Sequence, residues 1–306
     1  MVSWARRAGY RLLGSRFDFL LHTRPAEWPI VAAHATLGYL LAVGVGNALR
    51  SERLSSAALG VLLWVVCLNG GTLAFNSAFD RDEGDVAYLR SPPVPPAGLA
   101  SFGLVLMLAG FVGALVLPLA YRLAYALCVA LSVLYSAPPF RLKAVPGADW
   151  LINMWGFGTL TPYAGWTATG LPVGTTGTLI LLAFCPLFAA LYPLTQIYQL
   201  EEDARRGDRT LAISLGPRRS LLLAIVAAVL AFGLFALAGQ RSGWTPADRW
   251  RWIALILAAL GWGVVLIPWL RRHGRMASRQ HQRGMYRALI AWALTDLAVA
   301  LAWGTG

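Results

Sequence analysis

Charged residues are scarce in this sequence: Asp, Glu, Lys and Arg make up 13% of its 306 residues, whereas 58% are hydrophobic. A chain of this composition has too little charge to cover its surface and too much apolar surface to bury in one water-soluble core. We therefore exclude an ordinary soluble domain and predict that lipid surrounds much of the chain.

Cysteine and histidine are also rare, with three and four residues. Cys67, Cys128 and Cys185 all fall inside apolar runs, and none has Cys or His neighbours at the spacing of zinc ligands. The histidines are scattered along the chain. We therefore expect neither a zinc site nor a haem site and interpret the cysteines as packing residues.

Long apolar runs make up most of the sequence. About nine of them have roughly the 20 residues that an α-helix needs to cross a hydrocarbon layer of ~30 Å. The predicted spans are residues 28–48, 57–79, 98–118, 120–136, 149–170, 176–199, 219–239, 250–270 and 284–303. The sequence thus predicts an all-α, polytopic membrane protein with about nine transmembrane helices.

The residues before the first span form a separate predicted segment. Residues 1–27 contain Arg6, Arg7, Arg11 and Arg16 among aromatic and leucine residues, a composition typical of an amphipathic helix on the membrane surface. A cleaved signal peptide is disfavoured because the next apolar run is of spanning length and eight more follow. We predict a basic N-terminal segment at 1–27 and a nine-helix domain at 28–303.

Basic residues are unevenly divided between alternate loops. The net charge is +12, and with the spans above 20 of the 26 basic residues fall on the N-terminal side of the membrane and six on the other. Because cytoplasmic loops carry such an excess, we predict a cytoplasmic N-terminus and a C-terminus on the opposite side. Arginines spread through loops do not form one basic domain, so we predict no nucleic-acid partner.

Acidic residues are concentrated in two windows. Eight of the 14 Asp and Glu lie in NSAFDRDEGD (76–85) and QIYQLEEDARRGDRTL (196–211), both on the predicted cytoplasmic side. If the two helices continue through these windows, Asn76 and Asp80 stand one turn apart on one face, and so do Gln199 and Asp203. Such oxygen ligands suit Mg²⁺, which completes its shell with water and substrate phosphate. Loop charges that merely offset nearby arginines are the alternative.

Several basic residues on the same side could neutralise a diphosphate. The candidates are Arg24, Arg81, Arg141, Lys143 and Arg209. Arg and Lys stabilise phosphate oxygens through charge-assisted hydrogen bonds. The prolines of YSAPP, just before Arg141 and Lys143, restrict the backbone that carries these two side chains.

At these residues the chain resembles the UbiA superfamily of intramembrane prenyltransferases. That family carries Asn-Asp-x-x-Asp-x-x-x-Asp after its second helix and Asp-x-x-x-Asp, followed by Gly and Thr-Leu, after its sixth. The residues that match are Asn76 and Asp80 in the first motif, and Asp203, Gly207, Thr210 and Leu211 in the second. RPAEW (24–28) and YSAPPFRLK (135–143) are similar to two of the family's loops.

Three positions differ from the family pattern. Ser77, Gly84 and Gln199 stand where the family has Asp, which lowers the expected negative charge by up to three. Neighbouring carboxylates such as Glu83 and Glu202 can compensate. The resemblance therefore indicates an atypical member.

The resemblance implies a single bundle around a central cavity and Mg²⁺-dependent transfer of a prenyl group from a polyprenyl diphosphate to a lipophilic acceptor, among membrane lipid. The implied magnesium ligands are Asn76, Asp80, Glu83, Gln199, Glu202 and Asp203. Asp80 and Asp203 are thus catalytic, together with Tyr135 and Tyr198, whose rings can stabilise an allylic cation. Tyr163 and Tyr192 are further aromatic candidates, with helix packing as the alternative for each tyrosine.

Other functions stay open at this point. A terpene cyclase of the same superfamily ionises the same diphosphate, and a catalytically weakened relative could bind lipid alone. A transporter is the alternative from another class, although its ionisable groups are expected near the bilayer midplane. Asn69, Asn153 and Asp296 fall inside predicted spans, where each can contact the acceptor or join helices.

Overall fold

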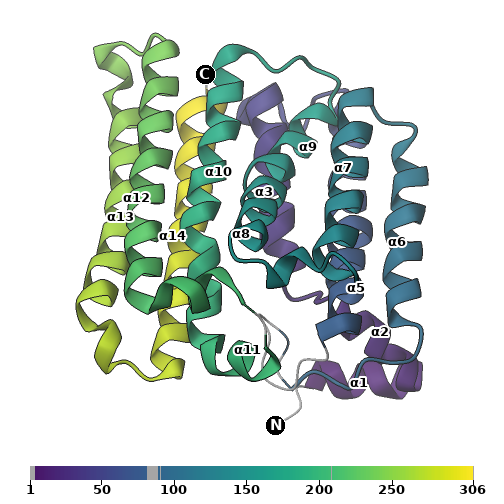
Figure 1. The fold of residues 1–306 in the computed structure, drawn as a ribbon. Coiled ribbons are helices and arrows are strands. Elements are labelled where there is room, and N and C mark those ends of the chain that lie inside the picture. The colour runs from purple at the N-terminus through teal and green to yellow at the C-terminus, as the bar shows by residue number, and fades with distance from the viewer. Residues whose placement is uncertain (1–3, 81–88, 90, 208, 306) are drawn as a thin grey trace.

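The chain folds into one helical bundle. The computed structural model describes residues 4–80, 89, 91–207 and 209–305, and among these residues there is no β-strand. The helices stand side by side, and α1 lies at one end of the bundle whereas the last turn of α14 lies at the other (Figure 1). The prediction of an all-α fold is confirmed.

The helical segments follow one another in the chain with short connections. The segments up to the middle of the chain are α1 (Trp4–Leu13), η1 (Gly14–Arg16), α2 (Phe17–His22), α3 (Trp28–Val43), η2 (Val45–Asn47), α4 (Leu54–Leu62), η3 (Leu63–Asn69), α5 (Gly70–Asp80), α6 (Leu99–Ala114) and α7 (Leu119–Ser136). They continue with η4 (Leu142–Ala144), α8 (Ala148–Asn153), η5 (Met154–Leu160), α9 (Thr161–Thr167), α10 (Thr175–Gln196), η6 (Ile197–Gln199), α11 (Leu200–Arg206), α12 (Leu211–Arg241), η7 (Pro246–Asp248), α13 (Arg249–Arg272), η8 (His273–Arg275) and α14 (Ser278–Gly304).

Six helical segments in the described part of the chain are long and apolar enough to cross a membrane. They coincide with the predicted spans at 57–79, 120–136, 176–199, 219–239, 250–270 and 284–303. Helices α3 and α6 are apolar but have 16 residues each. The multi-pass membrane character is thus confirmed, whereas the number of nine spans and the side on which each terminus lies stay predictions.

The outer surface of the bundle is apolar, as a lipid environment requires. In α13, Ile253, Ile256, Leu257, Leu260 and Val264 are all more than half exposed and share one face at helical spacing. In water a stripe of this size would drive aggregation, whereas acyl chains solvate it.

Two helical segments contain π-helical stretches at mid-length. η3 lies between α4 and α5, and η5 lies between α8 and α9. π-Helical turns re-aim side chains and occur frequently at functional sites. In η5 the main-chain oxygen of Gly156 accepts a hydrogen bond from Thr161 Oγ1 at 2.9 Å, and that of Gly158 lies 3.1 Å from His34 Nε2.

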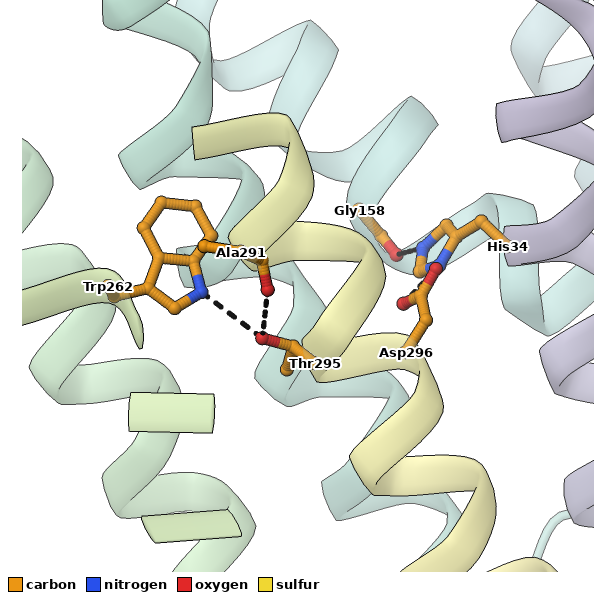
Figure 2. A network of polar contacts seen from close by, with 6 residues as sticks. All are labelled: His34, Gly158, Trp262, Ala291, Thr295 and Asp296. Atoms are coloured by element: carbon orange, nitrogen blue, oxygen red, sulfur yellow. Dashed lines mark hydrogen bonds and ion pairs between the residues drawn. The ribbon is translucent and has the colours of Figure 1, made fainter. Parts of the chain in front are cut away.

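Helix α3 is held by its neighbours on two sides. A Cβ atom on Gly38 would lie 1.7 Å from the Pro162 oxygen, so only glycine permits this approach of α3 and α9. Towards α14, His34 Nδ1 lies 3.0 and 3.1 Å from the two Asp296 carboxylate oxygens. Figure 2 shows that His34 and Trp262 meet α14 from opposite sides, at Asp296 and at the preceding Thr295.

The His34–Asp296 pair provides a stability test. Asp296→Leu is expected to lower the free energy of unfolding by about 3 kcal/mol, because it leaves the buried His34 without its carboxylate partner. The double variant His34→Leu/Asp296→Leu is expected to return to within about 1 kcal/mol of wild type, because apolar side chains replace both members. Unfolding by SDS in mixed micelles measures both values, and a single variant as stable as wild type contradicts the prediction.

Candidate active site

A cavity of about 350 Å³ opens among α3, α5, α7, α10 and α14. Both acidic motifs contribute to its walls. Of the residues predicted for the site, those that line the cavity are Arg24, Asn76, Asp80, Tyr135, Lys143, Tyr198, Gln199 and Asp203. The fold therefore brings together two motifs that lie far apart in the sequence.

The first motif is held by the segment YSAPPFRLK. Asn76 and Asp80 both belong to α5, as predicted. Asn76 Oδ1 accepts hydrogen bonds from Ser136 Oγ at 3.0 Å and from Lys143 Nζ at 3.1 Å, and Lys143 also forms an ion pair with the Asp80 carboxylate. The Arg141 guanidinium lies 3.8 Å from the same carboxylate. Two cations thus face Asp80.

The second motif does not lie on one continuous helix, so that prediction is wrong. Helix α10 ends at Gln196, a 3-10 turn covers Ile197–Gln199, and α11 starts at Leu200. Pro193 weakens the last turns of α10 because it has no N–H group for the Ala189 oxygen, which accepts from Trp150 Nε1 at 2.9 Å instead. Gln199 and the buried Asp203 nevertheless both line the cavity.

Asp149, which sequence reasoning missed, fixes this part of the chain. Its carboxylate is fully buried and accepts from Gln196 Nε2 at 2.8 Å, from the Leu211 N–H at 3.2 Å and from the Gly147 N–H at 3.0 Å. Asp149 therefore joins the start of α8, the end of α10 and the start of α12, and α11 with Asp203 lies between the last two. Its position could have been noticed in the sequence, because Asp149 is an acidic residue within the predicted span 149–170 and such residues are rare in spans.

Arg24 enters the cavity from the loop before α3. It is 7% exposed and has a φ of 51°. Glu27 follows within the same turn, where its N–H donates to the Arg24 oxygen at 2.9 Å. Burial raises the pKa of the Glu27 carboxyl, and the nearby Arg24 charge opposes that rise. A cation and a carboxyl group thus lie on the α3 side of the cavity.

Beyond the two motifs the cavity becomes an aromatic chamber. It is lined by Trp64, Phe157, Phe188 and Trp292, and Phe157 and Phe188 stack with ring centroids 5.3 Å apart. The hydroxyls of Tyr135 and Tyr192 are 2.9 Å apart, and both tyrosines line the cavity, as does Tyr198. Tyr163 is absent from this lining and faces another cavity, near α9 and α10. Such a chamber presents aromatic faces to a ligand.

The remaining predicted residues lie elsewhere. Arg209 is exposed and is not among the lining residues, so the structure does not bring it into the cavity. Arg81 and Glu83 lie outside the residues that the structure describes, and so does the side chain of Glu202.

The donor set fits magnesium held jointly with a phosphate ligand. The described residues of the two motifs contribute two carboxylates to the cavity, of Asp80 and Asp203, and two side-chain amides, of Asn76 and Gln199. Within the described residues no three His, Cys, Asp or Glu form a complete metal site. Magnesium is commonly bound by one or two carboxylates, with water and substrate phosphate completing its octahedral shell.

Comparison with known proteins gives consistent results. The sequence model of the UbiA prenyltransferase family matches residues 28–294. A lycopene elongase/hydratase of Haloferax volcanii is 29% identical over 245 residues, which are 76% of each chain. The probable homogentisate phytyltransferase 2 of Oryza sativa subsp. japonica is 31% identical over 159 residues, 48% of this chain and 40% of the plant protein.

Solved structures are similar in fold. A UbiA homolog from Archaeoglobus fulgidus bound to DMAPP and Mg²⁺ has a TM-score of 0.65 at 18% identity, covering 92% of this chain and 99% of the other. At 18% identity this match shows that the helices are arranged in the same fold.

Proposed function

The chain belongs to the UbiA prenyltransferase family and is a multi-pass membrane prenyltransferase, and we propose that it uses Mg²⁺ to transfer the prenyl group of a polyprenyl diphosphate to a lipophilic acceptor. The observation that carries the proposal is one cavity lined by Asp80 and Asp203 at one end and by aromatic side chains at the other. The charged diphosphate group is stabilised by Mg²⁺ and basic side chains, and its isoprenoid chain is stabilised by apolar side chains.

In the proposed reaction the bond between C1 and oxygen of the allylic diphosphate breaks, and its electron pair leaves on the diphosphate. C1 then forms a bond to the acceptor, which loses a proton. Magnesium held by Asn76, Asp80, Gln199 and Asp203 would neutralise charge that develops on the leaving diphosphate.

Basic side chains of the protein approach the proposed diphosphate site from two loops. Lys143 reaches the first motif from the loop after α7, and Arg24 comes from the loop before α3. We propose that both bind diphosphate oxygens, with Arg141 at the rim. The rings of Tyr135 and Tyr198 stabilise the allylic cation while the chamber keeps water away from it.

The proposal is tested with the purified full-length chain in lipid nanodiscs. A panel of labelled prenyl diphosphates is offered together with an extract of membrane lipids, and products are identified by the mass of the added prenyl group. We expect prenylated lipid and released diphosphate with Mg²⁺, loss of both with EDTA, and recovery when Mg²⁺ is restored. A terpene formed from the diphosphate alone would indicate a cyclase, and metal-dependent uptake into vesicles without diphosphate release would indicate a transporter.

A further inference from the structure

Three polar residues inside predicted spans were candidates for contact with the acceptor, and the structure separates them. Asp296 is paired with His34, and Asn153 Nδ2 donates to the Asp149 main-chain oxygen at 2.8 Å. Asn69 is different: it is 5% exposed, and neither its Oδ1 nor its Nδ2 atom has a hydrogen-bond partner in the described part of the protein. Its side chain lines the cavity.

Asn69 lies deeper in the cavity than the first motif. It is the last residue of η3 and precedes Asn76 by seven positions, which is about two helical turns on the same face. At 1.5 Å per residue, Asn69 is displaced from Asn76 by about 10 Å along the helix axis. An amide on this face is positioned for a ligand group that lies well beyond the diphosphate.

Other polar side chains that line the same cavity are already bonded within the protein. Thr72 Oγ1 lies 2.8 Å from Ser132 Oγ. Trp64 Nε1 donates to Thr161 Oγ1 at 3.2 Å, and Thr161 in turn donates to a main-chain oxygen. These groups leave little for a ligand, whereas the Asn69 amide offers both a donor and an acceptor.

An unsatisfied amide in a membrane protein is unfavourable, because no bulk water is present to bond it. A hydrocarbon ligand would leave Asn69 unsatisfied. A ligand with a carbonyl or hydroxyl oxygen would satisfy it and would be selected over a hydrocarbon of the same shape. The flat rings of Trp64 and Phe157 in the same chamber suit an unsaturated ring.

We propose that Asn69 is the hydrogen-bonding subsite for the acceptor, and that the acceptor carries a carbonyl or hydroxyl oxygen on an unsaturated ring. This inference rests on the proposed prenyl transfer, because only a transferase has an acceptor. The hydrogen bond itself is independent of the donor and can be measured without it.

The test compares saturable binding of 1,4-naphthoquinone and naphthalene, two ligands of closely similar ring shape, to the full-length protein in nanodiscs. Wild type is expected to bind the quinone about tenfold more tightly than the hydrocarbon, relative to their partition into protein-free nanodiscs. Asn69→Leu is expected to reduce this ratio to about one, with the loss confined to the quinone. Asn47→Leu, in the exposed η2 turn, is the matched control and should keep the wild-type ratio.

Thermal stability separates a ligand subsite from a structural amide. Because Leu has the same branching and number of side-chain heavy atoms as Asn, extends into the cavity and removes an unsatisfied group, Asn69→Leu should keep or raise the Tm. A clear fall in Tm would mean that the amide is bonded in the unliganded protein, by water or by the chain, and would overturn the inference. An unchanged ratio in Asn69→Leu, or no quinone preference in wild type, would overturn it as well.

A parallel measurement distinguishes a failure of this inference from a failure of the proposed function. Binding of prenyl thiolodiphosphates of several chain lengths to wild type is measured with and without Mg²⁺. Absence of any Mg²⁺-dependent binding would count against the proposed function, whereas the quinone comparison, made without donor, decides the role of Asn69.

Discussion

Asp80→Asn is expected to lower the rate of prenyl transfer by about 10³-fold while the protein stays folded. The amide keeps the size of the carboxylate and one oxygen, but it loses the negative charge that faces Lys143 and Arg141. Without that charge the first motif has only neutral oxygen donors among its described residues, and binding of Mg²⁺ with the diphosphate weakens. The rate is measured as labelled prenyl product per unit time with the donor that the panel identifies.

The expected loss has a matched control at the other end of the bundle. Asp248→Asn makes the same chemical change in η7, where the Asp248 carboxylate accepts from the Thr245 N–H at 3.0 Å. This variant should transfer at the wild-type rate with slightly lower stability, because one cap is weakened. Size-exclusion profiles and Tm values measure whether Asp80→Asn is folded. Undiminished transfer by a folded Asp80→Asn protein contradicts the metal-binding role of Asp80.

Much of the fold could be predicted because lipid imposes a minimum length on apolar helices. The predicted span at 120–136 differs by one residue from α7, Leu119–Ser136. Local backbone conformation, however, decides where each helix ends. The run at 28–48 is predominantly apolar, yet α3 ends at Val43, because Gly44 adopts a φ of 81°. The π-helical stretches were not predicted either, since one extra residue per turn hardly changes the apolar pattern.

Only those features of the candidate site that depend on local helical spacing could be predicted from the sequence. Asn76 and Asp80 share a helical face through local spacing alone. The bonds from Ser136 and Lys143 to Asn76 join residues 60 and 67 positions apart in the sequence, and no local pattern specifies such contacts. The unpaired amide of Asn69 is also a tertiary property, because only the folded chain shows which polar groups lack partners.

Lys143 connects the unliganded site to the proposed reaction. It is the one lysine in the sequence, it is 8% exposed, and its ammonium contacts both Asn76 and Asp80. In this position it neutralises the Asp80 carboxylate before substrate binds. An ammonium has three donors, so it can keep one bond to the motif and donate another to an incoming diphosphate. A cation held beside the carboxylate also opposes metal binding when phosphate is absent.

Lys143→Met is therefore expected to change two measurements in opposite directions. Transfer should fall by about 10²-fold, because one cation that stabilises the leaving diphosphate is lost. Binding of Mn²⁺ without donor, followed by electron paramagnetic resonance as a substitute for Mg²⁺, should become about tenfold tighter, because the competing charge is removed. Lys143→Arg retains the charge and should keep weak metal binding, with an intermediate rate, since the guanidinium fork fits the site less well.

The opposite signs distinguish a catalytic cation from a structural one. If Lys143 only held the loop after α7 against α5, its removal would loosen both motif residues, and transfer, metal binding and Tm would all fall together. Arg271→Met, at the exposed end of α13, removes the same unit of charge away from the cavity and should leave both measurements at wild-type values. A decrease in Mn²⁺ affinity for Lys143→Met would thus contradict the assignment of this lysine to the diphosphate.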